Sequence, residues 1–215
     1  MISKWKYDAR SRVTGLIGQL FVISLIISAP SLLDTILQFI KDPRVYLILL
    51  PIFLVIQFFL NAIFSLSNAY VYLNVARGEG AEISDAFYGF SNIGKALGLY
   101  FIMNLFIFLW SLLFIIPGII KSYEYRFAFF VLVDNPEMSI FECLKTSKEI
   151  TDGNKGQLFL LDLSYIGWYL LSIVTLGIHM IWIGPRIETS FACAYEELYF
   201  GYDDSEEEIL DVEID

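Results

Sequence analysis

Residues 154–200 decide the fold of this chain, and they read NKGQLFLLDLSYIGWYLLSIVTLGIHMIWIGPRIETSFACAYEELYF. Between Asp162 and Arg186 lie 23 residues with no charge other than a possible one on His179. At about 1.5 Å per residue, a helix of this length crosses the roughly 30 Å hydrocarbon core of a bilayer. A Gly/Pro break and a second, charged helix follow. The stretch therefore predicts a helix hairpin in a membrane.

The composition of the whole chain agrees with a membrane protein. Of 215 residues, 57% are hydrophobic and only 18% are charged, which leaves too much apolar surface for a soluble domain to bury. The formal net charge of -10 comes largely from residues 203–215, which hold eight acids and no base. The rest of the chain carries 14 bases against 16 acids. Without a basic face, nucleic acid is excluded as a partner.

The sequence offers little for catalysis. It contains one histidine, two cysteines without metal-ligand spacing, and none of the common nucleotide-binding, hydrolase or zinc motifs. The carboxylates of Asp162 and Glu188 are expected at opposite membrane faces, too far apart to act as a catalytic pair. We therefore expect neither an enzyme nor a cofactor or metal.

We predict an all-α membrane protein, a six-span bundle of helix hairpins with interfacial amphipathic helices. The expected spans are residues 15–33, 47–75, 96–116, 118–133, 157–177 and 185–200. The expected interfacial helices are residues 3–12, 83–91 and 139–151, the last opened by the capping box Ser139 to Glu142. Residues 1–202 form one bundle, and 203–215 form an acidic, disordered cytoplasmic tail.

The distribution of bases favours six spans with both termini in the cytoplasm. In that topology the inner side holds nine Lys and Arg residues and the outer side five. If segments 118–133 and 185–200 do not cross, the count becomes seven on each side. Because cytoplasmic loops carry the excess of bases, the six-span alternative is preferred.

Two hairpins share an order of features that suggests a parallel internal repeat. Residues 82–118 run from an amphipathic segment through Lys95 and Trp110 to Pro117-Gly118, and residues 137–185 run through Lys155 and Trp168 to Pro185. Chance similarity between apolar segments is the alternative.

One stripe of polar residues runs along the second span. Its members step by four, four, three and four positions, which places them on a single helical face: Gln57, Asn61, Ser65, Asn68 and Tyr72. They either hydrogen-bond to neighbouring helices or line a polar path.

Charged residues within spans need internal partners. Lys121 and Glu188 lie four and three residues beyond equivalent prolines, so we expect them to pair. Arg126 is expected to reach Asp162, which leaves Glu124 as the carboxylate most available for function.

The tail alternates acids with four apolar residues: Ile209, Leu210, Val212 and Ile214. This pattern is typical of a segment that docks on a partner protein, and a plain solvated tail is the alternative.

Several motifs resemble a family of bacterial integral membrane proteins known as domain of unknown function 975. The matching residues are Ser164-Tyr165-Ile166-Gly167-Trp168, Leu176-Gly177-Ile178, Trp182, Pro185, Thr189 and Tyr195, with Pro117-Gly118-Ile119, Tyr123 to Tyr125, Ser147, Gly153 and Lys155 upstream. Arg186 and the acidic tail depart from the pattern. The resemblance implies a multi-span protein of the bacterial plasma membrane and no particular activity.

Two functions are therefore expected from the sequence. The first is a non-enzymatic accessory or envelope-protection protein that acts through the lipid bilayer or through a cytoplasmic or membrane protein partner. The second is a small transporter or a protein that handles lipids or other amphiphiles, with a polar path along the second span. The sequence leaves the oligomeric state open.

Overall fold

The computed structural model describes residues 1–31, 42–175 and 180–214, and every element in these ranges is a helix. Side chains are described up to Phe200, apart from those of Met180 and Ile181. The helices are α1 (Ile2–Val13), α2 (Ile17–Ile27), α4 (Pro43–Arg77), η1 (Ile83–Asn92), α5 (Ile93–Leu113), α6 (Ile115–Glu124), α7 (Ala128–Asp134), α8 (Ile140–Thr151), α9 (Lys155–Leu163), α10 (Ile166–Val174) and α11 (Met180–Ile214).

Three helical stretches are long and apolar enough to cross a membrane: Pro43–Arg77, Ile83–Leu113 and Lys155–Val174. The pair α1 and α2, bent by 101°, adds a fourth if it forms one broken span. Large apolar side chains at the ends of these stretches are exposed, with Leu112 at 74% and Val174 at 79%. Such patches are unfavourable in water and favourable in lipid, so the architecture is that of a helical membrane protein.

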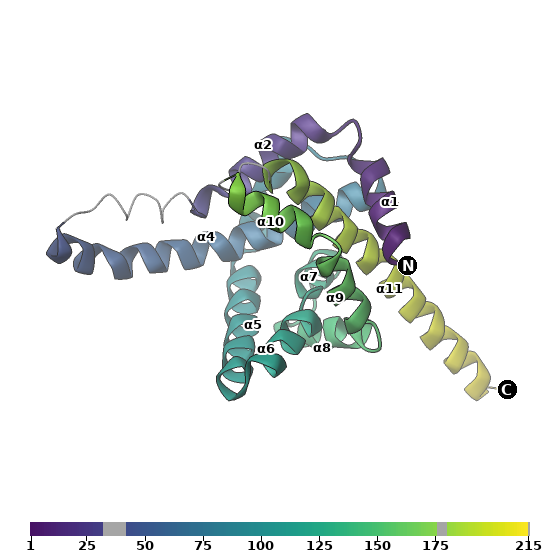
Figure 1. Ribbon diagram of the computed structural model, residues 1–215. Coiled ribbons are helices and arrows are strands. Elements are labelled where there is room, and N and C mark those ends of the chain that lie inside the picture. The colour runs from purple at the N-terminus through teal and green to yellow at the C-terminus, as the bar shows by residue number, and fades with distance from the viewer. Residues whose placement is uncertain (32–41, 176–179, 215) are drawn as a thin grey trace.

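Helix α4 organises the molecule. It begins at Asp42, whose carboxylate accepts the Arg44 N–H at 2.9 Å, and it ends at Gly78, where φ of 83° stops the helix. The half after Asn61 is buried against α1, α7 and α11, whereas the half before it projects from the bundle (Figure 1).

The structure has a helix at the predicted interfacial segment 83–91, and Ile83, Phe87 and Phe90 on it are about half exposed. It is the 3-10 helix η1, which packs along α4 and continues directly into α5. Ser67 Oγ accepts the Gly89 N–H at 2.8 Å, and the rings of Tyr70 and Tyr88 stack at 3.8 Å. Helix α5 then leaves α4 steeply (Figure 1).

The segment predicted to span at 118–133 is broken into α6 and α7. The reason lies in α8, where Ser147 Oγ accepts the Phe127 N–H at 3.2 Å and donates to the Glu124 carbonyl at 2.8 Å. These bonds satisfy backbone groups that the interrupted helix leaves free. Helix α8 itself begins with the predicted capping box of Ser139 and Glu142, which the structure confirms.

Other predicted boundaries also differ. Residues 157–177 contain two helices, α9 and α10, separated at Ser164 and Tyr165, and residues 176–179 with His179 lie outside the described ranges. Residues 32 and 33 of the first predicted span lie outside them as well. Helix α11 continues as helical backbone to Ile214, through the segment expected to be disordered. The side chains of Ile209, Leu210, Val212 and Ile214 are not described.

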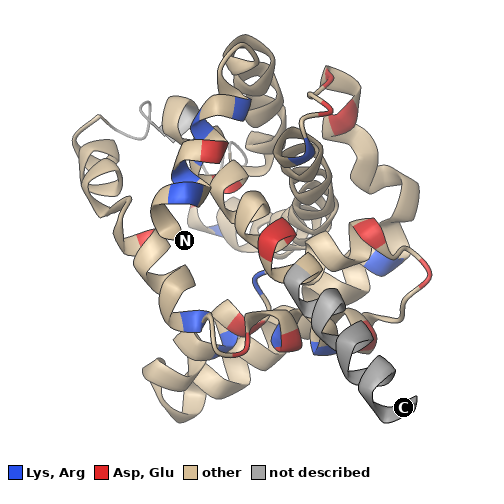
Figure 2. Ribbon diagram, turned by 90° about the vertical axis from the view of Figure 1, so that its right-hand side faces the viewer, with Lys and Arg blue, Asp and Glu red and all other residues tan. Residues whose placement is uncertain are grey.

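Charged residues are interleaved over the fold rather than separated by sign (Figure 2). Near the end of α4, Arg77 binds Asp134 of α7 and Glu196 of α11, each at 2.8 Å. Tyr195 donates to the same Asp134 carboxylate at 2.8 Å. This cluster ties three helices together at one end of the buried core.

Candidate functional site

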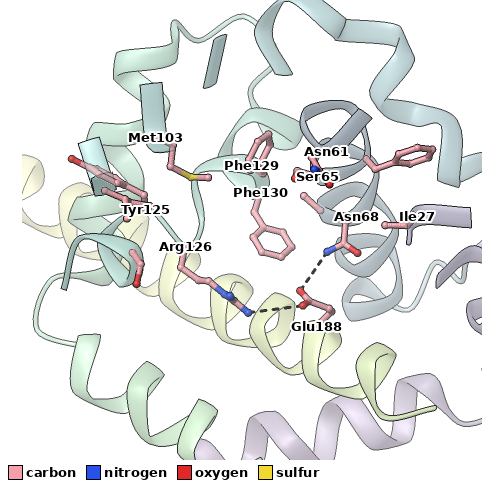
Figure 3. Close-up of a pocket in the computed structure, with 14 residues that line it drawn as sticks. Ile27, Asn61, Ser65, Asn68, Met103, Tyr125, Arg126, Phe129, Phe130 and Glu188 are labelled. Carbon is pink, nitrogen blue, oxygen red and sulfur yellow. Dashed lines mark hydrogen bonds and ion pairs between the residues drawn. The ribbon is translucent and has the colours of Figure 1, made fainter. Parts of the chain in front are cut away.

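A cavity of about 400 Å³ lies where α2, α4, α5, α11 and the α6–α7 break meet (Figure 3). Its lining combines polar, charged and apolar side chains: Ile27, Asn61, Phe64, Ser65, Asn68, Ala69, Met103, Ile107, Ser122, Tyr125, Arg126, Phe129, Phe130 and Glu188. Its volume falls within the range of about 300 to 1,000 Å³ typical of small-molecule sites.

Helix α4 contributes the polar wall through Asn61, Ser65 and Asn68. Their spacing of four and three residues brings them to one face, as the stripe in the sequence predicts. The two ends of that stripe lie elsewhere. The Tyr72 hydroxyl is 3.0 Å from Ser24 Oγ and joins α4 to α2, and Gln57 is not among the cavity-lining residues.

Two opposite charges face each other across the cavity (Figure 3). Arg126 comes from the α6–α7 break and Glu188 from α11, with an N–O distance of 4.0 Å. Asn68 Nδ2 donates to Glu188 Oε2 at 3.4 Å. The Arg126 guanidinium lies 4.0 Å from the centroid of the Phe191 ring, a cation–π contact that orients it.

Apolar side chains enclose the rest of the cavity. Phe129 and Phe130 of α7 are buried, and Met103 and Ile107 of α5 also line the cavity. These residues could not be singled out from the sequence, because an apolar residue in an apolar segment carries no distinguishing signal. The charges of Arg126 and Glu188 were the signal available, although the sequence analysis paired each of them with a different residue.

The remaining intramembrane charges pair differently from the prediction. Lys121 binds Glu124 at 2.5 Å rather than Glu188, and Asp162 accepts the Tyr123 hydroxyl at 2.7 Å rather than pairing with Arg126. Glu124 also binds Lys155 at 2.8 Å. The break after Glu124 changes the direction of the chain, so the helical periodicity used for the prediction does not hold across it. Glu124 is buried between two lysines and is not available to a ligand.

The chemical groups in the cavity are amides, hydroxyls, one guanidinium and one carboxylate. Within residues 1–31, 42–175 and 182–200, no group of three or more His, Cys, Asp or Glu side chains could hold a metal ion. Both free cysteines, Cys143 and Cys193, are buried and neither lines the cavity. The cavity has a small polar region with one positive and one negative side chain, and aromatic and aliphatic side chains surround this region.

A family model described as "Protein of unknown function (DUF975)" matches residues 2–128 and 113–199. The chain belongs to this family. No curated protein and no solved structure matches the chain.

All residues that line the cavity fall within the part of the chain that matches DUF975, since the lining runs from Ile27 to Glu188. The acidic segment 203–215 lies beyond the matched residues. The cavity is thus a feature of the DUF975 region itself, and the tail is an extension of it.

Proposed function

We propose that this DUF975 protein is a non-enzymatic protein of the bacterial plasma membrane that binds an amphiphile in the cavity between α4, α5, α7 and α11. The observation that carries the proposal is the composition of the lining, in which Asn61, Asn68 and Arg126 share one cavity with Met103 and Phe129. A polar headgroup can hydrogen-bond to the former while the chain of the same molecule contacts the latter. The volume accommodates a headgroup and the start of a single chain better than a whole diacyl lipid.

Filling the cavity tests the proposal. Ser65→Phe places an aromatic ring on the cavity wall, and Val55→Phe introduces the same ring on the exposed part of α4. We expect purified Ser65→Phe protein to bind a single-chain phospholipid analogue at least about tenfold more weakly than wild type, with Val55→Phe unchanged. Saturable binding that is equal in all three proteins would place the ligand elsewhere.

We further propose six membrane crossings with both termini in the cytoplasm. The supporting observation is that α4 and α11 run in the same direction, since Asn68 contacts Glu188 and, further along both helices, Arg77 contacts Glu196. Two helices that cross in the same direction agree with the predicted second and sixth spans. The parallel repeat of hairpins remains part of this proposal.

Single cysteines at Asp42 and Ser139, in a protein without Cys143 and Cys193, test the topology. A thiol reagent that cannot cross membranes should label position 42 from outside intact cells and should not label position 139. The reverse labelling would overturn the topology.

An accessory or envelope-protection role through the tail is the other proposal. It depends on residues 203–215, whose side chains the structure does not describe. Affinity purification of the full chain and of a chain ending at Tyr202 tests whether the tail docks on a partner. Recovery of the same partner proteins with both chains would exclude docking through the tail.

A further inference from the structure

The pair formed by Arg126 and Glu188 differs from the other ion pairs of the interior. Lys121 and Lys155 bind Glu124 at 2.5 and 2.8 Å, and Arg77 binds Asp134 at 2.8 Å. These distances are those of charge-assisted hydrogen bonds. Arg126 and Glu188 stand 4.0 Å apart, too far for a hydrogen bond, although both line the same cavity.

Both charged side chains keep access to the cavity. Each side chain is 34% exposed. The Glu124 side chain, which binds two lysines, is only 7% exposed. A guanidinium has five N–H donors and a carboxylate about four acceptor positions. The contact of Glu188 with Asn68, at 3.4 Å, is itself long. The cavity therefore presents a donor group and an acceptor group that can bind a ligand as well as each other.

The sign of the ligand follows from this arrangement. An anion at Arg126 is repelled by Glu188, and a cation at Glu188 is repelled by Arg126. A headgroup that carries both charges meets an opposite charge on each side. Because charges in an apolar environment are costly when unpaired, the match also relieves the cost of holding Arg126 and Glu188 within the bilayer.

Resting on the proposed function, we infer that the cavity selects zwitterionic amphiphiles, with the phosphate or carboxylate of the headgroup on Arg126 and its ammonium on Glu188. A phosphoethanolamine or phosphocholine headgroup has the required chemistry, since a two-carbon link holds its charges a few ångströms apart. Asn61 and Asn68 stand beside the pair as further donors and acceptors for the headgroup. Phe129 and Phe130 contact the chain.

Three probes share the same dodecyl chain and differ in headgroup charge, so they separate the effect of charge on binding from that of the chain: dodecylphosphocholine, dodecyl phosphate and dodecyltrimethylammonium. Each is titrated by calorimetry, below its critical micelle concentration, into the full chain purified in a maltoside. We expect wild type to bind the phosphocholine probe about tenfold or more tightly than either singly charged probe. Glu188→Gln should shift the preference to dodecyl phosphate, and Arg126→Gln should shift it to dodecyltrimethylammonium.

Two further variants keep the outcome decisive. Arg126→Gln combined with Glu188→Gln removes both charges together and should bind the three probes with similar affinity. Lys145→Gln, on the exposed face of α8, should behave as wild type. Elution as a single species by size exclusion shows which variants are folded.

The results distinguish two kinds of failure. If wild type binds all three probes equally and Ser65→Phe abolishes that binding, the cavity holds amphiphiles and the inference about charge is overturned. If wild type binds none of the probes saturably, the proposed function itself is overturned.

Discussion

Lys155 and Glu124 are 31 positions apart in the chain, and in the structure Lys155 Nζ lies 2.8 Å from Glu124 Oε1. The second oxygen of the same carboxylate binds Lys121 at 2.5 Å. Glu124 thus joins α6 to the start of α9, while its backbone carbonyl accepts a hydrogen bond from Ser147 of α8. Three helices converge on one buried carboxylate.

Glu124→Gln should be one of the most destabilising single changes in this chain. It leaves Lys121 without its carboxylate and leaves Lys155 with only Asp152, at 3.5 Å, in a partly buried environment. Removal of one partner from a buried ion pair typically costs about 3 to 5 kcal/mol, and we expect a loss of about 3 kcal/mol because the lysines retain some access to water. Unfolding by SDS in mixed micelles measures the difference.

The control for this change is Lys145→Gln. Lys145 pairs with Glu149 at 3.7 Å on the surface of α8, with 75% of the lysine side chain exposed. Exposed pairs of this kind contribute about 0 to 1 kcal/mol. Equal losses in the two variants would show that Glu124 is not a buried junction.

Gly89 is expected to tolerate no side chain. A Cβ atom at this position would overlap the carbonyl oxygen of Ile63, because η1 approaches the α4 backbone closely there. Gly89→Ala should therefore separate η1 from α4 and destabilise the protein by about 2 kcal/mol, as overpacking in a core does. SDS unfolding of this variant measures the loss.

Gly94→Ala is the matched control. Gly94 lies in α5, only five positions away, and a Cβ atom there has no neighbour within 4 Å. Since alanine is the better helix former by about 1 kcal/mol, this change should be neutral or stabilising. A loss of stability at Gly94 comparable to that at Gly89 would contradict the close packing of η1.

The sequence allowed the membrane class and the family to be predicted, and it located part of the candidate site. A charge-free run is sufficient to indicate a span, and the steps of four and three residues place Asn61, Ser65 and Asn68 on one helical face. These signals are local. The pairing of Arg126 with Glu188 is not local, because it depends on a helix break at residues 125–127 that Ser147 stabilises from another helix.

The η1 helix shows a second limit of prediction from sequence. Its amphipathic composition is compatible with a membrane surface and equally with one helix packed along another. The packing of η1 along α4 depends on Gly89 fitting against Ile63 and on the stack of Tyr88 with Tyr70, contacts between residues on different helices. Periodicity within one segment contains no information on such contacts.

Tyr195 links the α11 helix to the charged cluster at the end of α4. Its hydroxyl donates to Asp134 at 2.8 Å, and the residue is fully buried. Tyr195→Phe keeps the ring, which stacks on Phe130, and removes only the hydrogen bond. Hydrogen bonds to charged groups contribute about 1.5 to 3 kcal/mol, so we expect a loss of about 1.5 kcal/mol in SDS unfolding. Tyr7→Phe, on the exposed face of α1, should leave stability unchanged.

The capping box of α8 predicts how this helix responds to pH. Glu142 Oε2 accepts the Ser139 N–H at 2.7 Å, and hydrogen bonds from the Ser139 side chain and backbone lower the pKa of the Glu142 carboxyl below its ordinary value of 4.5. A carboxyl group with a lowered pKa in the folded state stabilises that state above its unfolded pKa, and this contribution disappears as the pH falls through the folded pKa. Hydrogen exchange of the α8 amides should therefore be slower in wild type than in Glu142→Gln at pH 6, after correction for intrinsic rates. The difference should shrink below about pH 4.5 and vanish once Glu142 is protonated. Ser139→Ala removes the hydroxyl partner, so it should speed exchange at pH 6 and weaken the pH dependence. A difference between wild type and Glu142→Gln that is constant from pH 6 to pH 3 would mean that the carboxylate charge does not stabilise α8.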